Sequence, residues 1–296
     1  MALLTATSIQ LDADCGLGAG DSYLVRDVLP PDLTASAFEC IAEEVGWGKM
    51  FHRGGEVPRL VAVQGDIDRD GSYPIYRHPS DTSPPVLPFS PTVAAIRAHI
   101  EPIVGKLNHV LIQRYRDGAD YISEHSDKTV DVVRGSNIVN VSLGAERVMV
   151  LRAKRDSVHK DAEGPHNPPR PAQRVPLPHN SMFVMGLETN QRQLHGIPHD
   201  RRPLAQKSTA EQFMGGERVS LTFRNIGTFV SHDGTKIWGT GAKSKTRDNA
   251  GDVIVGKDGE SEAEKLLEAF GRENRESAFV WEDWYGQGFD VVNFGL

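Results

Sequence analysis

The sequence contains little cysteine, no long apolar run and no excess of basic charge. Its 296 residues include only two cysteines, Cys15 and Cys40. Two cysteines are too few for a disulfide framework or a cysteine-rich zinc site, and they favour a reducing compartment. No apolar run approaches the ~20 residues that a membrane helix needs, and the first residues lack the basic start and apolar run of a secretory signal. We therefore expect no membrane partner and a cytoplasmic or nuclear location.

The charge balance is mildly acidic and uneven along the chain. There are 33 Lys and Arg residues against 40 Asp and Glu residues. Residues 241–296 alone hold 7 basic and 12 acidic side chains, so most of the acidity lies there. Neither part has the strongly basic character of a typical nucleic-acid-binding domain. A local basic groove is still compatible with this balance, because net charge does not report how charge is distributed.

The middle of the chain is rich in short β-type segments. Their apolar and β-branched residues predict strands at 109–115, 137–143, 148–152, 181–185 and 218–223. Helical spacing predicts helices at 33–45 and 91–104, the second beginning with Ser90 and Pro91. Strands at near-regular spacing with helices upstream favour an α+β fold: a sandwich or jelly roll with helices packed on one face.

Composition suggests three segments. We interpret residues 1–20 as a loose N-terminal leader, residues 21–230 as the main domain, and residues 231–296 as a C-terminal extension that docks on it. Within the main domain, residues 46–89 are rich in Gly, Pro and Tyr and predict turns and short strands, while the Pro-rich segment 156–178 predicts a surface loop. Trp281, Trp284, Tyr285 and Phe289 make the extension too apolar for a free tail.

A candidate metal site begins with the triplet His125-Ser126-Asp127. Residues i and i+2 project from the same face of an extended chain, so His125 and Asp127 can hold one metal ion together. A third ligand must come from a distant histidine, and His179, His195 and His199 are all candidates. Two histidines and one carboxylate on one face of an iron leave positions open for O2 and a co-substrate.

A second pattern is the arginine-flanked segment Arg218-Val-Ser-Leu-Thr-Phe-Arg224. On a strand, Arg218, Ser220, Thr222 and Arg224 project from one side. Two guanidiniums inside a sheet need anionic partners, because an unpaired buried charge is costly. A dicarboxylate ligand held by charge-assisted hydrogen bonds meets this need.

Taken in order, these motifs resemble those of the AlkB-type Fe(II)/2-oxoglutarate-dependent dioxygenases, and most closely the AlkB homologues that repair alkylated DNA. The matching segments are 57–59 with 65–66, 110–118, 125–127, 141–147, 194–198 and 218–224. The resemblance covers roughly residues 50–228 and implies a double-stranded β-helix, or jelly-roll, core. It also implies Fe(II) as the metal, with 2-oxoglutarate and O2 as co-substrates.

The resemblance implies a role for each matched residue. His125, Asp127 and His195 correspond to the iron ligands, with the His-Gly-Ile-Pro context favouring His195 over the other two histidines. The residues that correspond to the 2-oxoglutarate site are Arg218, Arg224, Tyr115, Gln113 and Ser220. Gln113 and Ser220 stand where the family more often has Asn, and both still offer hydrogen bonds.

The implied reaction is oxidative demethylation: an N-alkyl C–H of a modified nucleobase is hydroxylated, with release of formaldehyde, succinate and CO2. Repair members usually carry an extra acidic residue just after the H-x-D, whereas Lys128 and Thr129 follow it here. Gln64 replaces an aromatic before Gly65-Asp66, and Tyr73 and Tyr76 are candidates to stack on a base. The candidate substrate residues are thus Gln64, Asp66, Tyr73, Tyr76, Lys128 and Thr129, within a lid formed by residues 46–89.

Two substrate classes therefore remain open. One is alkylated DNA or RNA, favoured by the extent of the resemblance. The other is a small molecule, oxidised by an enzyme that keeps the AlkB core, and it is favoured by Lys128, Thr129, Gln64 and the lack of net basic charge. In either case we expect a monomer.

Overall fold

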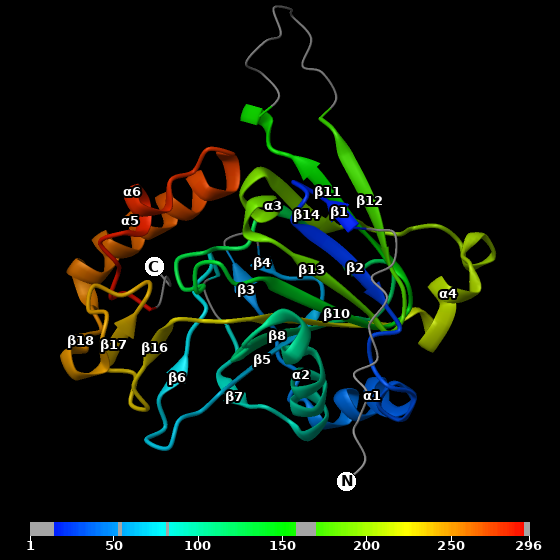
Figure 1. The fold of residues 1–296 in the computed structure, drawn as a ribbon, viewed down its shortest axis with the longest axis horizontal. Coiled ribbons are helices and arrows are strands. Elements are labelled where there is room, and N and C mark those ends of the chain that lie inside the picture. The colour runs from blue at the N-terminus through cyan, green and yellow to red at the C-terminus, as the bar shows by residue number, and fades with distance from the viewer. Residues whose placement is uncertain (1–14, 53–54, 81–82, 158–169, 293–296) are drawn as a thin grey trace, which may run out of the picture.

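The computed structural model describes residues 15–52, 55–80, 83–157 and 170–292. Two facing β-sheets form its centre (Figure 1). The larger sheet has the strand order β1 (Cys15–Leu17), β2 (Ser22–Arg26), β13 (Ser181–Met185), β10 (Ile138–Gly144), β15 (Arg218–Arg224), β8 (His109–Tyr115), β5 (Leu60–Gly65) and β7 (Val86–Pro88). The smaller has the order β12 (Ala172–Leu177), β11 (Arg147–Ala153), β14 (Gln193–Ile197) and β9 (Ile122–His125). All described pairings in these sheets are antiparallel except β5 with β7.

Helices cover the outer face of the larger sheet. They are α1 (Pro31–Glu44) and α2 (Pro91–Val104), each with a proline at its first position. Phe38 and Ile41 of α1 and Ile96 and Ile100 of α2 are buried against outward-facing residues of the sheet such as Val141. Together with the two sheets, this gives the α+β jelly roll with helices on one face that the sequence predicts.

Strict alternation separates two cores in the larger sheet. On β8, Val110 and Ile112 pack under the helices, whereas Tyr115 belongs to the core between the two sheets. On β15, Val219, Leu221 and Phe223 belong to the helix-side core. The intervening residues of β15 are thereby directed into the space between the sheets, as the period of two requires.

The C-terminal segment packs against the open side of the two sheets. Its elements are β16 (Thr228–Val230), β17 (Lys236–Gly239), β18 (Gly251–Asp252), α5 (Gly256–Arg275) and α6 (Trp281–Tyr285), with β6 (Tyr73–Pro74) joining the small sheet that they form. Leu266 and Phe270 of α5 and Tyr285 of α6 are buried with Val130, which follows the H-x-D triplet. The other strands and α-helices of the described residues are the antiparallel pair β3 (Phe51–His52) and β4 (Gly55–Glu56), α3 (Leu187–Arg192) and α4 (Thr209–Gln212).

Some sequence expectations need correction. The segment 156–178, expected to be a loop, contains β12, which pairs along β11; residues 158–169 lie outside the described residues. Part of the expected leader forms β1, while residues 1–14 also lie outside them.

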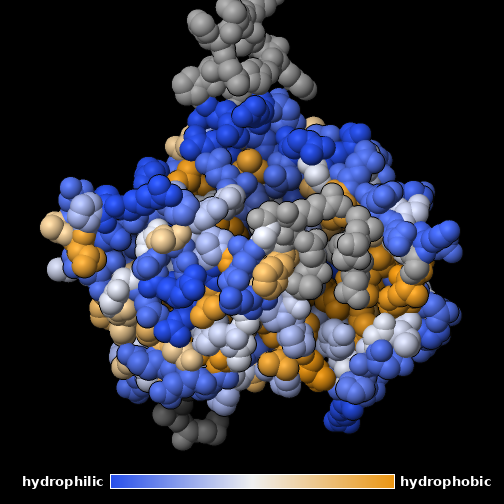
Figure 2. Space-filling model, turned by 180° about the vertical axis from the view of Figure 1, so that it is seen from behind, coloured by the Kyte–Doolittle hydropathy of each residue, from blue (hydrophilic) through white to orange (hydrophobic). Residues whose placement is uncertain are grey.

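The surface is mixed in character. Seen from behind, apolar residues gather in several patches in the lower half, and the upper edge is mostly hydrophilic (Figure 2). Among the described residues, no helix is both long enough and apolar enough to cross a bilayer.

Candidate active site: a His-Asp-His cluster in an arginine-lined cavity

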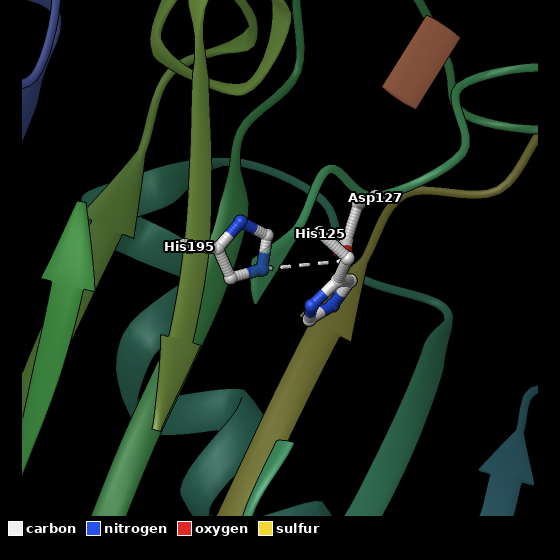
Figure 3. A group of neighbouring side chains, drawn as sticks. All are labelled: His125, Asp127 and His195. Carbon is white, nitrogen blue, oxygen red and sulfur yellow. Dashed lines mark ion pairs between the residues drawn. The ribbon is translucent and has the colours of Figure 1, made fainter. Parts of the chain in front are cut away.

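The two histidines and the aspartate meet at one edge of the smaller sheet. Strand β14 pairs with β9 so that His195 lies opposite His125, and Asp127 follows two residues later. Nε2 of His125 and Nε2 of His195 lie 3.5 and 3.6 Å from Oδ1 of Asp127. One candidate ligand atom from each residue lies within 4.8 Å of the other two, and the three side chains converge (Figure 3). Two imidazoles and a carboxylate form the donor set of an open iron site, so this cluster can hold Fe(II).

The other two candidate histidines lie elsewhere. His179 accepts a hydrogen bond from the amide of Gly144 at 3.0 Å and packs edge-on against Phe213. His199 lies against Tyr121, with ring centroids 3.9 Å apart. The geometry therefore selects His195 from the three alternatives.

Asp127 is fixed from both of its ends. The backbone amide of Asp127 donates to the side-chain Oδ1 of Asn190 at 2.8 Å, and the side-chain Nδ2 of Asn190 donates back to the backbone carbonyl of Asp127 at 2.9 Å. Its Oδ2 accepts from Nε and Nη2 of Arg224 at 3.1 and 2.5 Å. Burial alone raises the pKa of Asp127, but Arg224 and the two histidines hold that pKa well below its usual value. The carboxylate is thus ionised, which a metal ligand must be.

The histidines are held in a state suited to metal binding. Burial and the neighbouring His125 lower the pKa of His195, which keeps its imidazole neutral. Nδ1 of His125 lies 2.8 Å from the carbonyl of Ser123 and, as the donor of that bond, leaves Nε2 free for a metal.

Arg218 lies deeper in the same cavity and has an unpaired donor. Its Nη2 donates to Oγ of Ser142 at 2.7 Å and to Oδ1 of Asn140 at 3.1 Å. Its Nη1 is buried and has no hydrogen-bond partner among the described residues. Burial lowers its pKa only to about 10, so the guanidinium keeps its charge at neutral pH. A buried cation with an unpaired N–H fits a carboxylate of 2-oxoglutarate.

The other predicted co-substrate residues surround this arginine. The hydroxyl of Tyr115 donates to Oε1 of Gln113 at 3.1 Å, and the Arg218 guanidinium lies 5.2 Å from the centre of the Tyr115 ring. Oγ of Ser220 accepts from Asn140 at 2.7 Å. Gln113, Tyr115, Arg218, Ser220 and Arg224 all line the cavity, so the structure brings the whole predicted set together.

The cavity has a volume of about 510 Å³, large enough for a small organic ligand and a base-sized substrate. The metal cluster and the predicted co-substrate residues lie in its wall, together with Tyr76 and Lys128 from the predicted substrate set. The rings of Tyr76 and His78 lie beside one another, 5.4 Å apart.

The remaining predicted substrate residues do not line this cavity. Gln64 is buried on β5 and accepts a hydrogen bond from the amide of Ser90, because its side chain faces the start of α2. Asp66 pairs with Arg97 at the surface. Tyr73 packs with Val230 and Ile237 in the C-terminal sheet, and Thr129 donates to Glu273 of α5.

Sequence reasoning missed several cavity residues. His78 and Arg59 lie in the predicted lid segment, and Asn140 comes from a strand whose inward face the alternation could have revealed. The C-terminal helix α5 also supplies cavity wall, through Leu267, Phe270, Gly271 and Asn274. The only sequence signal for this contact is the apolar face of that helix.

Comparison with known proteins identifies the class. Residues 21–224 match the family model described as the 2OG-Fe(II) oxygenase superfamily. The chain belongs to this superfamily, whose members use Fe(II), 2-oxoglutarate and O2, and the AlkB-type resemblance is confirmed.

Three curated relatives show which members of the superfamily the chain is similar to. The chain is 36% identical over 180 residues to the protein named DNA oxidative demethylase ALKBH2 from Homo sapiens, which covers 60% of this chain and 60% of that protein. It is 33% identical over 181 residues to the protein of the same name from Mus musculus, covering 60% and 66%. It is 25% identical over 199 residues to alpha-ketoglutarate-dependent dioxygenase alkB homolog 3 from Bos taurus, covering 64% and 61%. The match spans about three fifths of the length of these relatives.

Proposed function

We propose that this chain is an AlkB-type dioxygenase that removes N-alkyl groups from nucleobases. The observation that carries the proposal is the similarity to proteins named DNA oxidative demethylase over 180 residues. The superfamily match over residues 21–224 supports it, because these residues include every candidate iron and 2-oxoglutarate residue. We propose that this catalytic domain spans residues 21–230, with residues 231–296 docked on it, and that the protein acts as a monomer in the cytoplasm or nucleus.

Each side chain has a defined task in this proposal. His125, Asp127 and His195 hold Fe(II), while Arg224 keeps Asp127 ionised and oriented toward the metal. Arg218 holds one carboxylate of 2-oxoglutarate through its unpaired Nη1, and Tyr115, Gln113 and Ser220 complete the polar lining around it. Nη1 of Arg224, whose contact with the carbonyl of Thr222 is long at 3.4 Å, is available to the second carboxylate.

Bound iron supplies the oxidising chemistry that breaks a substrate C–H bond. In the balanced reaction, 2-oxoglutarate is oxidised to succinate and CO2 and takes one atom of O2. The other oxygen atom is inserted into the N-methyl group, and the resulting hemiaminal breaks its C–N bond to give formaldehyde and the free base. The protein chain positions the methyl group and excludes water.

A flat substrate fits the aromatic wall beside the metal cluster. Tyr76, His78 and His125 all line the cavity. Burial lowers the pKa of His78 to about 4, so its ring is neutral and suited to stacking. Enzymes that modify a base extrude it from the strand and hold it between such rings.

The test measures succinate and formaldehyde together, with Fe(II), 2-oxoglutarate and either methylated or unmodified oligonucleotides. We expect both products from a methylated strand, and far less succinate and no formaldehyde from the unmodified one. Equal, slow succinate formation with every strand and no formaldehyde would overturn the nucleobase proposal and favour the small-molecule alternative.

A further inference from the structure

Lys128 lies in the wall of the cavity, directly after the candidate iron ligand Asp127. Its side chain is buried, with only 4% of the residue exposed. Its backbone amide donates to the hydroxyl of Tyr76 at 3.0 Å, which fixes the residue beside the aromatic wall. The backbone of Lys128 is thereby fixed between the candidate iron ligand Asp127 and the aromatic wall of the cavity.

The ammonium group of Lys128 has little to hold it. Its one described hydrogen bond is to Oδ1 of Asn274 in α5, and this contact is long at 3.4 Å. The buried carboxylate of Glu273, the neighbour of Asn274 in α5, is engaged elsewhere: it accepts from the amide and hydroxyl of Thr129 and from the hydroxyl of Tyr285. Glu273 does not line the cavity, whereas Lys128 and Asn274 do. The cavity therefore faces the cation of Lys128 but not the carboxylate of Glu273.

The charged residues that line the cavity are mostly cationic, like Lys128. Among the described residues that line it, four are cationic and one is acidic: Arg59, Lys128, Arg218 and Arg224 against Asp127. Fe(II) and doubly charged 2-oxoglutarate cancel one another, so loading the site leaves this excess of positive charge unchanged. A cationic substrate meets repulsion here, and it is strong because the groups are buried.

We propose that Lys128 makes this enzyme selective for uncharged alkylated bases that carry a carbonyl oxygen beside the alkylated nitrogen. This inference rests on the proposed nucleobase function and names its substrate class. Alkylation at N3 of thymine or N1 of guanine leaves a neutral ring with a neighbouring carbonyl oxygen, which an ammonium group can bind. Alkylation at N1 of adenine or N3 of cytosine gives a cation, which the ammonium group of Lys128 repels. 1-Methyladenine also has no carbonyl oxygen for Lys128 to bind, whereas 3-methylcytosine keeps O2 beside the alkylated nitrogen and is disfavoured by its charge alone.

The test compares four oligonucleotides, containing 3-methylthymine, 1-methylguanine, 1-methyladenine or 3-methylcytosine, by the kcat/KM of formaldehyde release. The variants are Lys128→Met, which keeps the length and apolar stem, and the matched control Lys154→Met. Lys154 is also a buried lysine, and its ammonium group donates to the backbone carbonyl of Glu273. Lys154 does not line the cavity. The ratio between neutral and cationic substrates is the readout, because a general folding defect lowers both rates together.

We expect the native enzyme to prefer the two neutral bases, and Lys128→Met to reduce that preference by at least about tenfold. Lys154→Met should leave the ratio unchanged. A native preference for the cationic bases, or a ratio that Lys128→Met does not change, would overturn the inference while leaving the demethylase function intact. Absence of formaldehyde from all four strands would overturn the proposed function, and this inference with it.

Discussion

Arg224 donates two hydrogen bonds to Oδ2 of Asp127 and leaves Oδ1 turned toward the two histidines. The pairing joins the two motifs of the sequence, the H-x-D triplet and the arginine-flanked strand, across 97 positions. Of the two arginines of β15, Arg224 therefore has a carboxylate partner inside the protein, whereas Arg218 has a buried Nη1 with no partner among the described residues.

Replacing a residue of the cluster should remove metal binding. We expect His125→Ala, Asp127→Ala and His195→Ala to abolish stoichiometric Fe(II) binding, because each removes one of three protein ligands. Equilibrium dialysis of Fe(II) under anaerobic conditions measures this. His199→Ala is the matched control and should bind iron normally. Loss of iron in that variant, with binding retained by His195→Ala, would show that the third ligand is misassigned.

Arg218 should control affinity for 2-oxoglutarate. We expect Arg218→Ala to raise the KM for 2-oxoglutarate by at least about tenfold, because it removes a charge-assisted hydrogen bond in a buried site. Arg218→Lys should recover part of the loss, since it restores the charge without the planar fork. Steady-state succinate formation measures both, and a KM that stays at the native value in Arg218→Ala would contradict the assignment.

The partly buried His78 should make the fold sensitive to mild acid. Burial lowers its pKa from 6.5 to about 4, so between these values the unfolded chain binds a proton that the folded chain does not. The contribution of neutral His78 to the free energy of unfolding is therefore complete above pH 6.5 and is lost as the pH falls toward 4. The largest loss is on the order of 3 kcal/mol. Urea unfolding at pH 7 and pH 5 should show a smaller acid loss in His78→Phe than in the native protein. Equal losses would exclude this role for His78.

The C-terminal extension should contribute strongly to stability. Leu266 is fully buried in the cluster around Val130, and we expect Leu266→Ala to cost about 2–5 kcal/mol in unfolding free energy. Leu204→Ala, at a position 67% exposed, is the matched control and should change stability little. Deletion of residues 241–296 should likewise lower the melting temperature, and an unchanged value would contradict the docked arrangement.

Local patterns predicted much of this site. The period of two in 218–224 correctly places Arg218, Ser220 and Arg224 on the cavity side, and the strand predicted at 109–115 has those bounds in the structure. Such predictions succeed because alternation in a two-core sheet is a property of consecutive residues.

Contacts between distant segments could not be predicted in this way. Asn274 reaches Ser126 across 148 positions, and no local pattern near either residue reports that contact. The side-chain directions of Gln64 and Tyr73 cannot be inferred from sequence for a related reason. Residues 61–65 of β5 are all buried, so no alternation marks the direction of Gln64, and the two-residue strand β6 is too short to show a period. Strands β9 and β14 are short and partly polar, so they carried too weak a signal to be predicted.

The central claim is that one cavity holds Fe(II) on His125, Asp127 and His195 and 2-oxoglutarate on Arg218. The most direct measurement is an anaerobic titration of the 296-residue chain with Fe(II) and then with 2-oxoglutarate, monitored by visible absorption. We predict a charge-transfer band at one equivalent of each, present in the native protein and absent in Asp127→Ala. A native protein that forms no such band, or an Asp127→Ala variant that forms it at full strength, would contradict the account.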